Sequence, residues 1–333
     1  AGSPISASPT TGSPADLGLS KVRLPDGRVE LLQRVLLEHR AEIVGPSARS
    51  YGSDAGAPLY PLLVKLLDSA EQLGIQCHPD DVLAARHFSA PSGKTEAWLI
   101  LNTRQIPGCD PPYILLGFKP GVTREDLAWA IEQADPKATA ALLHKIPVRP
   151  GDMFIIQARV PHAIGPGIFM AEVQQPADIT ILADRAIGGR TVPEERCHLG
   201  IGWEKALDCF AFDGCSLEET RRRWQLQPRL LRTEPSGSEW ELIGSSVSKY
   251  FCATRLGVTG SFRCPGGAAH TVLVLAGEGT VEAATAGGDS AASPWRKRIK
   301  QGDALFFPCQ VPDHIYKSAD PSQELRVLRC FPV

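Results

Sequence analysis

The stretch of sequence that decides the fold is YPLLVKLLDSAEQLGIQCHPDDVLAARHFSAPSGKTEAWLIL at residues 60–101. It carries two polar pairs within apolar runs, Gln76 with His78 and Lys94 with Glu96. Residues two apart on a β-strand point to the same face, so each pair would share one side of a strand. Imidazole nitrogens and carboxylate or amide oxygens suit a divalent ion such as zinc. The pattern predicts either a metal cluster inside a β structure or ordinary polar residues at strand ends.

The composition is that of an ordinary globular protein. Of 333 residues, 43% are hydrophobic and 22% are charged, and the net charge of −2 gives no basis for predicting nucleic acid or a membrane as a partner. No apolar run reaches the roughly 20 residues that span a bilayer, and the first residues lack the pattern of a secretory signal. The nine cysteines form no CxxC pair, which favours reduced thiols and a cytoplasmic location. Cys77 should point away from Gln76 and His78, into the core.

Apolar periodicity along the chain separates helical regions from β regions. The predicted segments are, in order, a flexible tail at 1–19, a helix from Val29 to Ile43 closed by Gly45, two helices at 123–146 with Thr123 as the first N-cap, antiparallel strands at 148–182, a helical region at 203–232, and an all-β region over the last hundred residues.

An internal parallel links the two halves of the chain. The segment GDMFIIQARVPHAI at 151–164 can be laid against GDALFFPCQVPDHI at 302–315. Each has Gly-Asp, an apolar strand, a polar turn, and then proline and histidine. Two copies of one β unit predict a duplicated barrel or sandwich.

Four segments resemble, in order, the signature segments of type I mannose-6-phosphate isomerases, most closely the short bacterial form. They are PLLVKLLDSAEQLGIQCHPDD at 61–81, GKTEAWLIL at 93–101, GDMFIIQARVPHAIG at 151–165 and AEVQQPADIT at 171–180. The resemblance implies a mainly β fold with added helices, a bicupin of two jelly-roll β-barrels. The implied divisions are a tail at 1–19, a metal-binding cupin with helical insertions at 20–190, a helical linker at 191–234, and a cupin without metal at 235–333.

The resemblance also implies the roles of individual residues. One zinc ion, or another divalent metal, would be held by Gln76, His78, Glu96 and His162. The other implied site residues are Lys94 and Glu172 for catalysis, Lys94, Arg159 and Gln174 for substrate binding, and Arg185 and Arg190 as candidate catalytic cations. The implied reaction interconverts mannose 6-phosphate and fructose 6-phosphate through an enediol, in a monomer or homodimer whose partner is a small sugar phosphate.

The chain departs from the family pattern at three places. Leu182 stands where relatives have an arginine, which is why Arg185 and Arg190 become candidates, and Gly74 stands where relatives often have a serine. A third departure is the N-terminus, where the first twenty residues have no match to the family's opening strand with its Trp-Gly-Gly segment. Leu182 and this missing strand motivate an alternative, a non-catalytic or differently specific bicupin that binds sugars or sugar phosphates. A third hypothesis is a metal-dependent cupin with other chemistry, such as an oxygenase.

Overall fold

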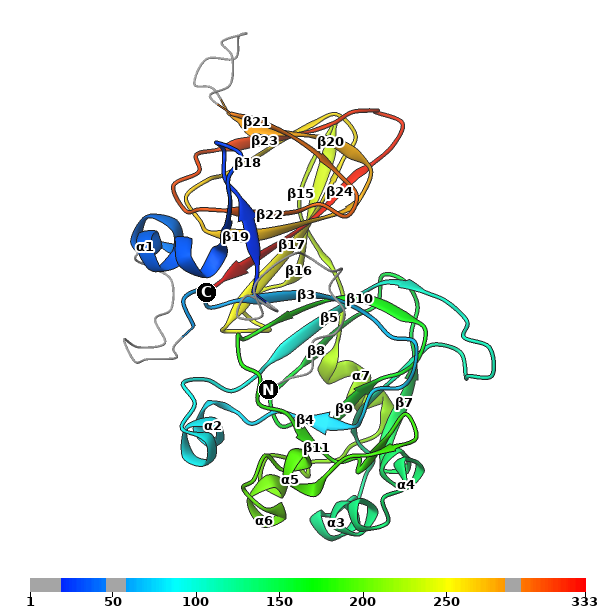
Figure 1. Ribbon diagram of the computed structural model, residues 1–333. Coiled ribbons are helices and arrows are strands. Elements are labelled where there is room, and N and C mark those ends of the chain that lie inside the picture. Colours follow the sequence, from blue (N-terminus) through cyan, green and yellow to red (C-terminus); the bar gives the residue numbers. More distant parts are fainter. Residues whose placement is uncertain (1–18, 46–57, 285–294) are drawn as a thin grey trace. The chain divides into compact units, whose positions relative to one another are not determined.

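The computed structural model describes residues 19–45, 58–284 and 295–333 (Figure 1). The chain forms two compact units: the first unit comprises residues 62–229 and 242–251, and the second unit comprises residues up to 61, 230–241 and 252–333. The described residues 20–45 and 58–61, predicted as part of the metal-binding cupin, therefore group with the second unit. Almost all of the predicted tail at 1–19 lies outside the described residues. None of the helices in the described ranges is both long and apolar enough to cross a membrane.

Two five-stranded sheets build the first unit, and their strand orders are β14-β8-β5-β10-β3 and β11-β4-β9-β6-β7. The strand β6, YILLGF, is buried at all six positions, as expected where a strand packs on both faces. The strands are β3 (Leu63–Asp68), β4 (Gln76–Cys77), β5 (Glu96–Thr103), β6 (Tyr113–Phe118), β7 (Leu143–Pro147), β8 (Met153–Ile156), β9 (His162–Ile164), β10 (Ile168–Gln174), β11 (Ile181–Leu182) and β14 (Gln225–Leu226), with a separate ribbon of β12 (Ala186–Ile187) and β13 (Arg190–Thr191).

Six helices accompany these sheets. They are α2 (Asp81–Phe88), α3 (Arg124–Glu132), α4 (Pro136–Ala141), α5 (Glu194–Cys197), α6 (Trp203–Leu207) and α7 (Leu217–Trp224). The two helices predicted at 123–146 are confirmed as α3 and α4, although the end of that segment is strand β7. Thr123 and Asp126 form a reciprocal capping box at the start of α3.

The predicted helical region at 203–232 is only partly correct. Helix α7 ends at Trp224, whose indole packs so closely over Gly117 that a Cβ there would lie 2.5 Å from the ring. The chain then turns to strand β14 and to β15 (Arg229–Glu234), where a strand pairing with β16 overrides helical propensity.

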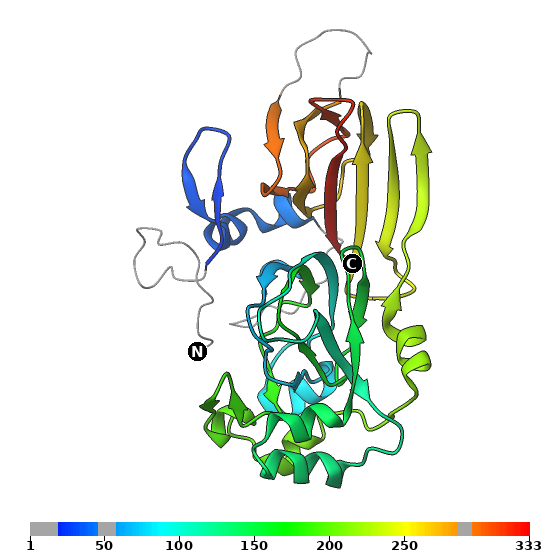
Figure 2. The same cartoon turned by 90° about the vertical axis from the view of Figure 1, so that its right-hand side faces the viewer.

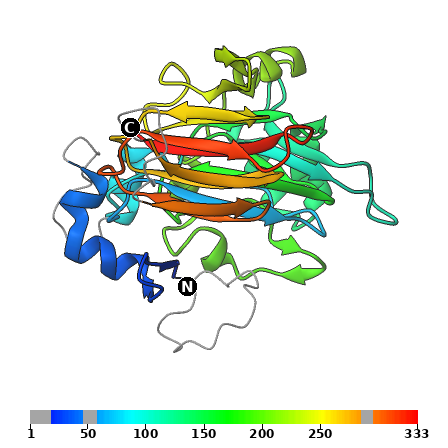
Figure 3. The ribbon, with the colours of Figure 1, turned by 90° about the horizontal axis from the view of Figure 1, so that it is seen from above.

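The second unit is also a two-sheet β structure, with strand orders β15-β16-β17-β24-β19-β22 and β18-β23-β20-β21. Figure 2 shows the β15–β16 hairpin in yellow-green, and Figure 3 shows strands of the six-stranded sheet lying side by side. Besides β15, the strands of these two sheets are β16 (Gly237–Ile243), β17 (Phe251–Val258), β18 (Ser261–Cys264), β19 (His270–Ala276), β20 (Glu278–Ala283), β21 (Arg296–Lys300), β22 (Ala304–Phe307), β23 (His314–Ser318) and β24 (Leu325–Pro332). The second unit also contains β1 (Lys21–Arg23), β2 (Val29–Leu31) and α1 (Leu32–Val44). The helix predicted from Val29 thus begins at Leu32, three residues further along the chain, and Gly45 caps it in a positive-φ conformation (φ 83°).

The predicted duplication is confirmed by matching hydrogen bonds. In the first unit Gly151 N donates to Ile100 O (2.8 Å) and Ile100 N donates to Asp152 O (3.0 Å). In the second unit Gly302 N donates to Val274 O (3.0 Å) and Val274 N donates to Asp303 O (2.9 Å). Both glycines have positive φ, which a residue with a side chain rarely adopts. All nine cysteines are free.

Candidate metal centre

His78, Glu96 and His162 converge inside the first unit, although they come from three places in the sequence. Glu96 begins β5, His162 begins β9, and His78 follows β4 directly (Figure 1). Their ligand atoms all lie within 4.8 Å of one another, with His78 Nε2 3.5 Å from Glu96 Oε2 and His162 Nε2 3.4 Å from Glu96 Oε1. All three side chains are buried. In the part of the chain that the structure describes, this is the only group of three such residues.

A close backbone approach brings the two predicted polar pairs together. Gly93 packs against the turn that follows His78, so that a Cβ at 93 would lie 2.4 Å from Pro79 O. Lys94 N donates to that same Pro79 oxygen (3.1 Å), and Gly93 N donates to Asp81 Oδ1 (2.9 Å). The glycine that precedes Lys94 is therefore required by packing, and the packing places Glu96 opposite His78.

Both histidines direct an unprotonated Nε2 toward the centre of the group. His78 Nδ1 donates to Ile179 O (2.8 Å) and His162 Nδ1 donates to Val160 O (2.9 Å), which fixes the tautomer in each ring. Burial lowers the pKa of both rings, and that of His162 falls to about 4. The two imidazoles are therefore neutral at physiological pH, the state in which imidazole binds a metal.

The donor set fits a cation. Glu96 Oε1 is buried without a hydrogen-bond partner, and the ammonium of Lys94 lies 2.6 Å from Glu96 Oε2 and 3.2 Å from His78 Nε2. Burial alone would raise the pKa of Glu96, but the Lys94 ammonium holds it well below its usual range. Gln76 lies beside the group, with its amide nitrogen 3.3 Å from His162 Nε2. Two imidazoles, a carboxylate and an amide form a set that zinc and other divalent ions accept.

A chain of charges leads outward from the centre. Lys94 Nζ lies 3.7 Å from Glu172 Oε1, and Glu172 Oε2 lies 3.5 Å from Lys65 Nζ. The Lys94 and Glu172 side chains are almost fully buried, whereas 33% of the Lys65 side chain is exposed. Burial and the nearby charge of Glu96 raise the pKa of Glu172 to about 7, although both lysines oppose the shift.

Lys65 is a site residue that the sequence interpretation missed. It lies on β3 directly opposite Glu172 of β10. Its signal in the sequence was weak, because a single lysine within PLLVKLLD is typical of a strand with one solvent-facing position. Gln174, which was predicted, lies opposite Glu96 in the β5–β10 register. Its amide group donates to Gln175 O and Ala177 O, and its Oε1 is buried without a hydrogen-bond partner.

Two of the three predicted arginines make contacts away from the metal centre, and the third is exposed. The guanidinium of Arg159 donates to the carbonyls of Asp208 and Phe210. Arg185 pairs with Glu194 of α5 (3.7 Å), and Arg190 is exposed on β13 and forms no ion pair or side-chain hydrogen bond with any residue in the described ranges. The structure therefore does not bring these arginines to the metal centre.

The departures from the family pattern at Gly74 and Leu182 are physically linked. Leu182 lies directly opposite Gln76 in the β4–β11 pair, so the two side chains share a face. A Cβ at Gly74 would lie 2.4 Å from Ile187 Cδ1 and 3.5 Å from Leu182 Cδ2. Apolar side chains thus fill the space beside Gln76 that a serine at 74 would need.

Comparisons with known proteins place these observations in context. No family profile matches the chain. It is 37% identical over 122 residues to a probable mannose-6-phosphate isomerase of Bacillus subtilis, and 36% identical over 121 residues to a second mannose-6-phosphate isomerase of that organism. Each match covers about 37% of this chain and 36% of the relative's length, so the matched segment spans little more than a third of either relative.

The likeness in structure extends over nearly the whole chain. The crystal structure of the mannose 6-phosphate isomerase from Bacillus subtilis superposes with a TM-score of 0.70 at 21% identity, covering 94% of this chain and 85% of that one. The chain therefore has the fold of the phosphomannose isomerases, and the predicted mainly β bicupin is confirmed.

Proposed function

We propose that this protein is a metal-dependent aldose–ketose isomerase that interconverts mannose 6-phosphate and fructose 6-phosphate. The observation that carries the proposal is the buried group of His78, Glu96 and His162, adjoined by Lys94 and Glu172. The names of the matched relatives and the shared fold support it. Zinc is the metal we propose, on the strength of the nitrogen and oxygen donors.

The ligands would be His78, Glu96 and His162, with Gln76 as a possible fourth. Three protein ligands would leave the fourth position open for a substrate oxygen, as a catalytic site requires. When bound, the metal supplies positive charge that stabilises the enediolate formed between C1 and C2 of the sugar. The Nδ1–H bonds of the two histidines hold their rings in the orientation that this role needs.

Glu172 is the group we assign to proton transfer. Burial raises its pKa, to about 7 in the metal-free chain, and a raised pKa would allow it to accept a proton from one sugar carbon and return it to the other near neutral pH. Lys94, 3.7 Å away, would stabilise the ionised carboxylate and orient it. The unpartnered Oε1 of Gln174 offers an acceptor for a sugar hydroxyl.

Lys65 and Lys94 are the cations best placed to receive an anionic sugar. Lys65 is the most exposed member of the chain of charges, and it would meet the substrate first. Neither Arg185 nor Arg190 contacts the metal group, so we assign no step to them.

The test is turnover by metal-loaded protein. Fructose 6-phosphate should yield mannose 6-phosphate, and Glu172→Gln should lower kcat about 10²- to 10⁴-fold with the metal content unchanged. Glu218→Gln, an exposed glutamate on α7, is the matched control and should leave kcat unaltered. Equal loss in both variants, or no loss in either, would contradict the role of Glu172.

A second candidate function is a sugar-phosphate-binding protein without turnover. Leu182 beside Gln76 favours it, because an apolar side chain replaces the arginine of relatives. Under this hypothesis sugar phosphates raise the melting temperature while no isomerisation is detected.

We also infer that the second unit holds no metal at the corresponding place. Strand registers pair the two units position by position. The corresponding residues are Gln76 and Cys264, His78 and Gly266, Glu96 and His270, His162 and His314, and Glu172 and Arg329. A glycine thus replaces one ligand, and the buried Arg329 guanidinium, paired with Glu239, places a fixed cation near the others. Metal analysis should find one ion per chain.

Reduced cysteines throughout favour the predicted cytoplasmic location, which we retain as a proposal. The expected monomer or homodimer also remains a proposal.

A further inference from the structure

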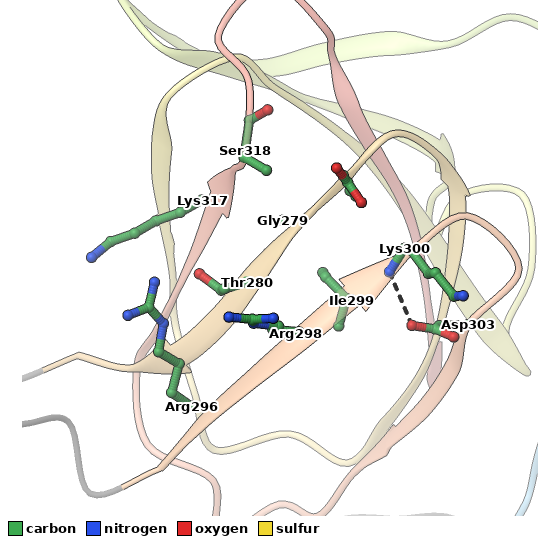
Figure 4. Close-up of a pocket in the computed structure, with 11 residues that line it drawn as sticks. Gly279, Thr280, Arg296, Arg298, Ile299, Lys300, Asp303, Lys317 and Ser318 are labelled. Atoms are coloured by element: carbon green, nitrogen blue, oxygen red, sulfur yellow. Dashed lines mark hydrogen bonds between the residues drawn. The ribbon is translucent and has the colours of Figure 1, made fainter.

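A second charged site lies on the four-stranded sheet of the second unit, in a pocket of about 620 Å³ (Figure 4). Strands β20, β21 and β23 build it. Its lining is rich in basic side chains that come from neighbouring strands. These are Arg296, Arg298 and Lys300 of β21 and Lys317 of β23.

Strand register places the central residues in one row. Thr280 lies directly opposite Arg298 in the β20–β21 pair and directly opposite Lys317 in the β20–β23 pair. Residues directly opposite each other project from the same face of a sheet. Two cations therefore flank one hydroxyl. Ile299 and Val281, which alternate with these residues, point into the apolar core of the unit.

The cations near Thr280 outnumber the carboxylates there. Lys317 and Arg296 share the single carboxylate of Glu282. Among the residues that the structure describes, Arg298 has no carboxylate within ion-pair distance. Glu278 and Asp303 also line the pocket, and Asp303 accepts a hydrogen bond from the backbone of Lys300 (2.9 Å). Four basic and two acidic residues line the pocket, Glu282 beside it adds a third carboxylate, and the surplus of positive charge gathers around Thr280.

Thr280 supplies an independent sign of a ligand. Its Oγ1 is buried and has no hydrogen-bond partner in the described structure. An unsatisfied buried hydroxyl is uncommon, because it loses its bonds to water without replacement. In Figure 4 the hydroxyl lies on the side toward Arg296 and Lys317. An oxyanion placed there would accept from the hydroxyl and from the surrounding cations at once.

We propose that this pocket binds a phosphate group, held by Arg298, Arg296 and Lys317 and by the hydroxyl of Thr280. Guanidinium groups suit phosphate because they offer paired N–H donors in a planar fork. A volume of about 620 Å³ exceeds what phosphate alone needs, so the ligand class is a small phosphorylated molecule. The site is exposed, and its binding will weaken with ionic strength. It shares no residue with the metal centre and does not rest on the proposed isomerase activity.

The probe is inorganic phosphate, followed by backbone amide NMR of the full chain, with chloride at matched ionic strength as the reference. The amides of Thr280, Arg298 and Lys317 should shift with phosphate and not with chloride. A second titration with fructose 6-phosphate distinguishes free phosphate from the phosphate group of a larger molecule as the ligand. Tighter binding at these amides would mean that the sugar contributes, and equal binding would mean that the phosphate alone is recognised.

Variants make the site assignment specific. Arg298→Gln should weaken phosphate binding at these amides at least fivefold, and Thr280→Val, which keeps the side-chain shape, should weaken it measurably. Lys297→Gln removes the same charge from the same strand but on the opposite face, and it should change nothing. The proposal is overturned if phosphate and chloride shift these amides alike, or if Arg298→Gln and Lys297→Gln weaken phosphate binding alike.

Discussion

Asp184 offers a quantitative test of how the metal-centre strand β4 is held. The carboxyl is 2% exposed, and its Oδ2 accepts a hydrogen bond from the backbone of Ile75, the residue before Gln76 (2.8 Å). Burial raises its pKa from 3.8 to about 6. The ionised form is therefore disfavoured in the folded chain relative to the unfolded one. Asparagine at 184 keeps an oxygen to accept from Ile75 but cannot ionise.

The sign and size follow from this shift of about two pKa units, each worth about 1.4 kcal/mol. Well below pH 3.8 the carboxyl is protonated in both the folded and the unfolded chain, and Asp184 costs nothing. Between pH 3.8 and 6 the unfolded chain ionises before the folded one, so the free energy of unfolding falls as pH rises, by about 1 kcal/mol at pH 4.5 and by about 3 kcal/mol at pH 7.5. Asp184→Asn should therefore exceed the parent protein in free energy of unfolding by these amounts.

The assay is a urea titration of metal-free protein at pH 4.5, 6 and 7.5, read from amide hydrogen exchange of β5, which reports the first unit alone. Asp213→Asn, an exposed carboxylate whose side chain is 64% accessible, is the control and should show no gain that grows with pH. If Asp184→Asn shows the same difference from the parent at all three pH values, the burial argument is refuted.

Three further changes test the centre itself. Gly93→Ala should lower zinc content and turnover together, because the new Cβ would meet the Pro79 and Asp80 backbone; full zinc occupancy measured by atomic emission would contradict this. Glu96→Gln removes the charged ligand and should weaken zinc binding about tenfold or more in a chelator competition, whereas unchanged affinity would exclude it as a ligand. Leu182→Arg restores a cation beside Gln76 and should lower KM for fructose 6-phosphate without altering zinc content; an unchanged KM would show that this position does not face the substrate.

The sequence predicted the ligand group because its signals are local. Strand alternation places Gln76 on the same face as His78 and Lys94 on the same face as Glu96, and this does not depend on which strands lie beside them. The family resemblance then added His162, more than 60 residues further along the chain. The two Gly-Asp turns have matching geometry because each needs a glycine with positive φ, and both glycines, Gly151 and Gly302, are visible in the repeated segment of the sequence.

Long-range pairing decided the features that could not be predicted. Lys65 joins the site only because β3 lies beside β10, which places it opposite Glu172. The family resemblance implied a substrate-binding role for Arg159, but a positive-φ backbone (φ 73°) and two carbonyl acceptors direct its guanidinium to Asp208 and Phe210. The sequence pattern of residues 229–232 predicted a helix, but in the structure these residues belong to β15 because they pair with β16.

The most direct test of the central claim is turnover of fructose 6-phosphate by the full chain loaded with one zinc ion, followed by NMR of the sugar phosphates. The account predicts that mannose 6-phosphate accumulates to equilibrium, that a chelator abolishes its formation, and that added zinc restores it. Protein that holds one zinc ion per chain and forms no mannose 6-phosphate would contradict it.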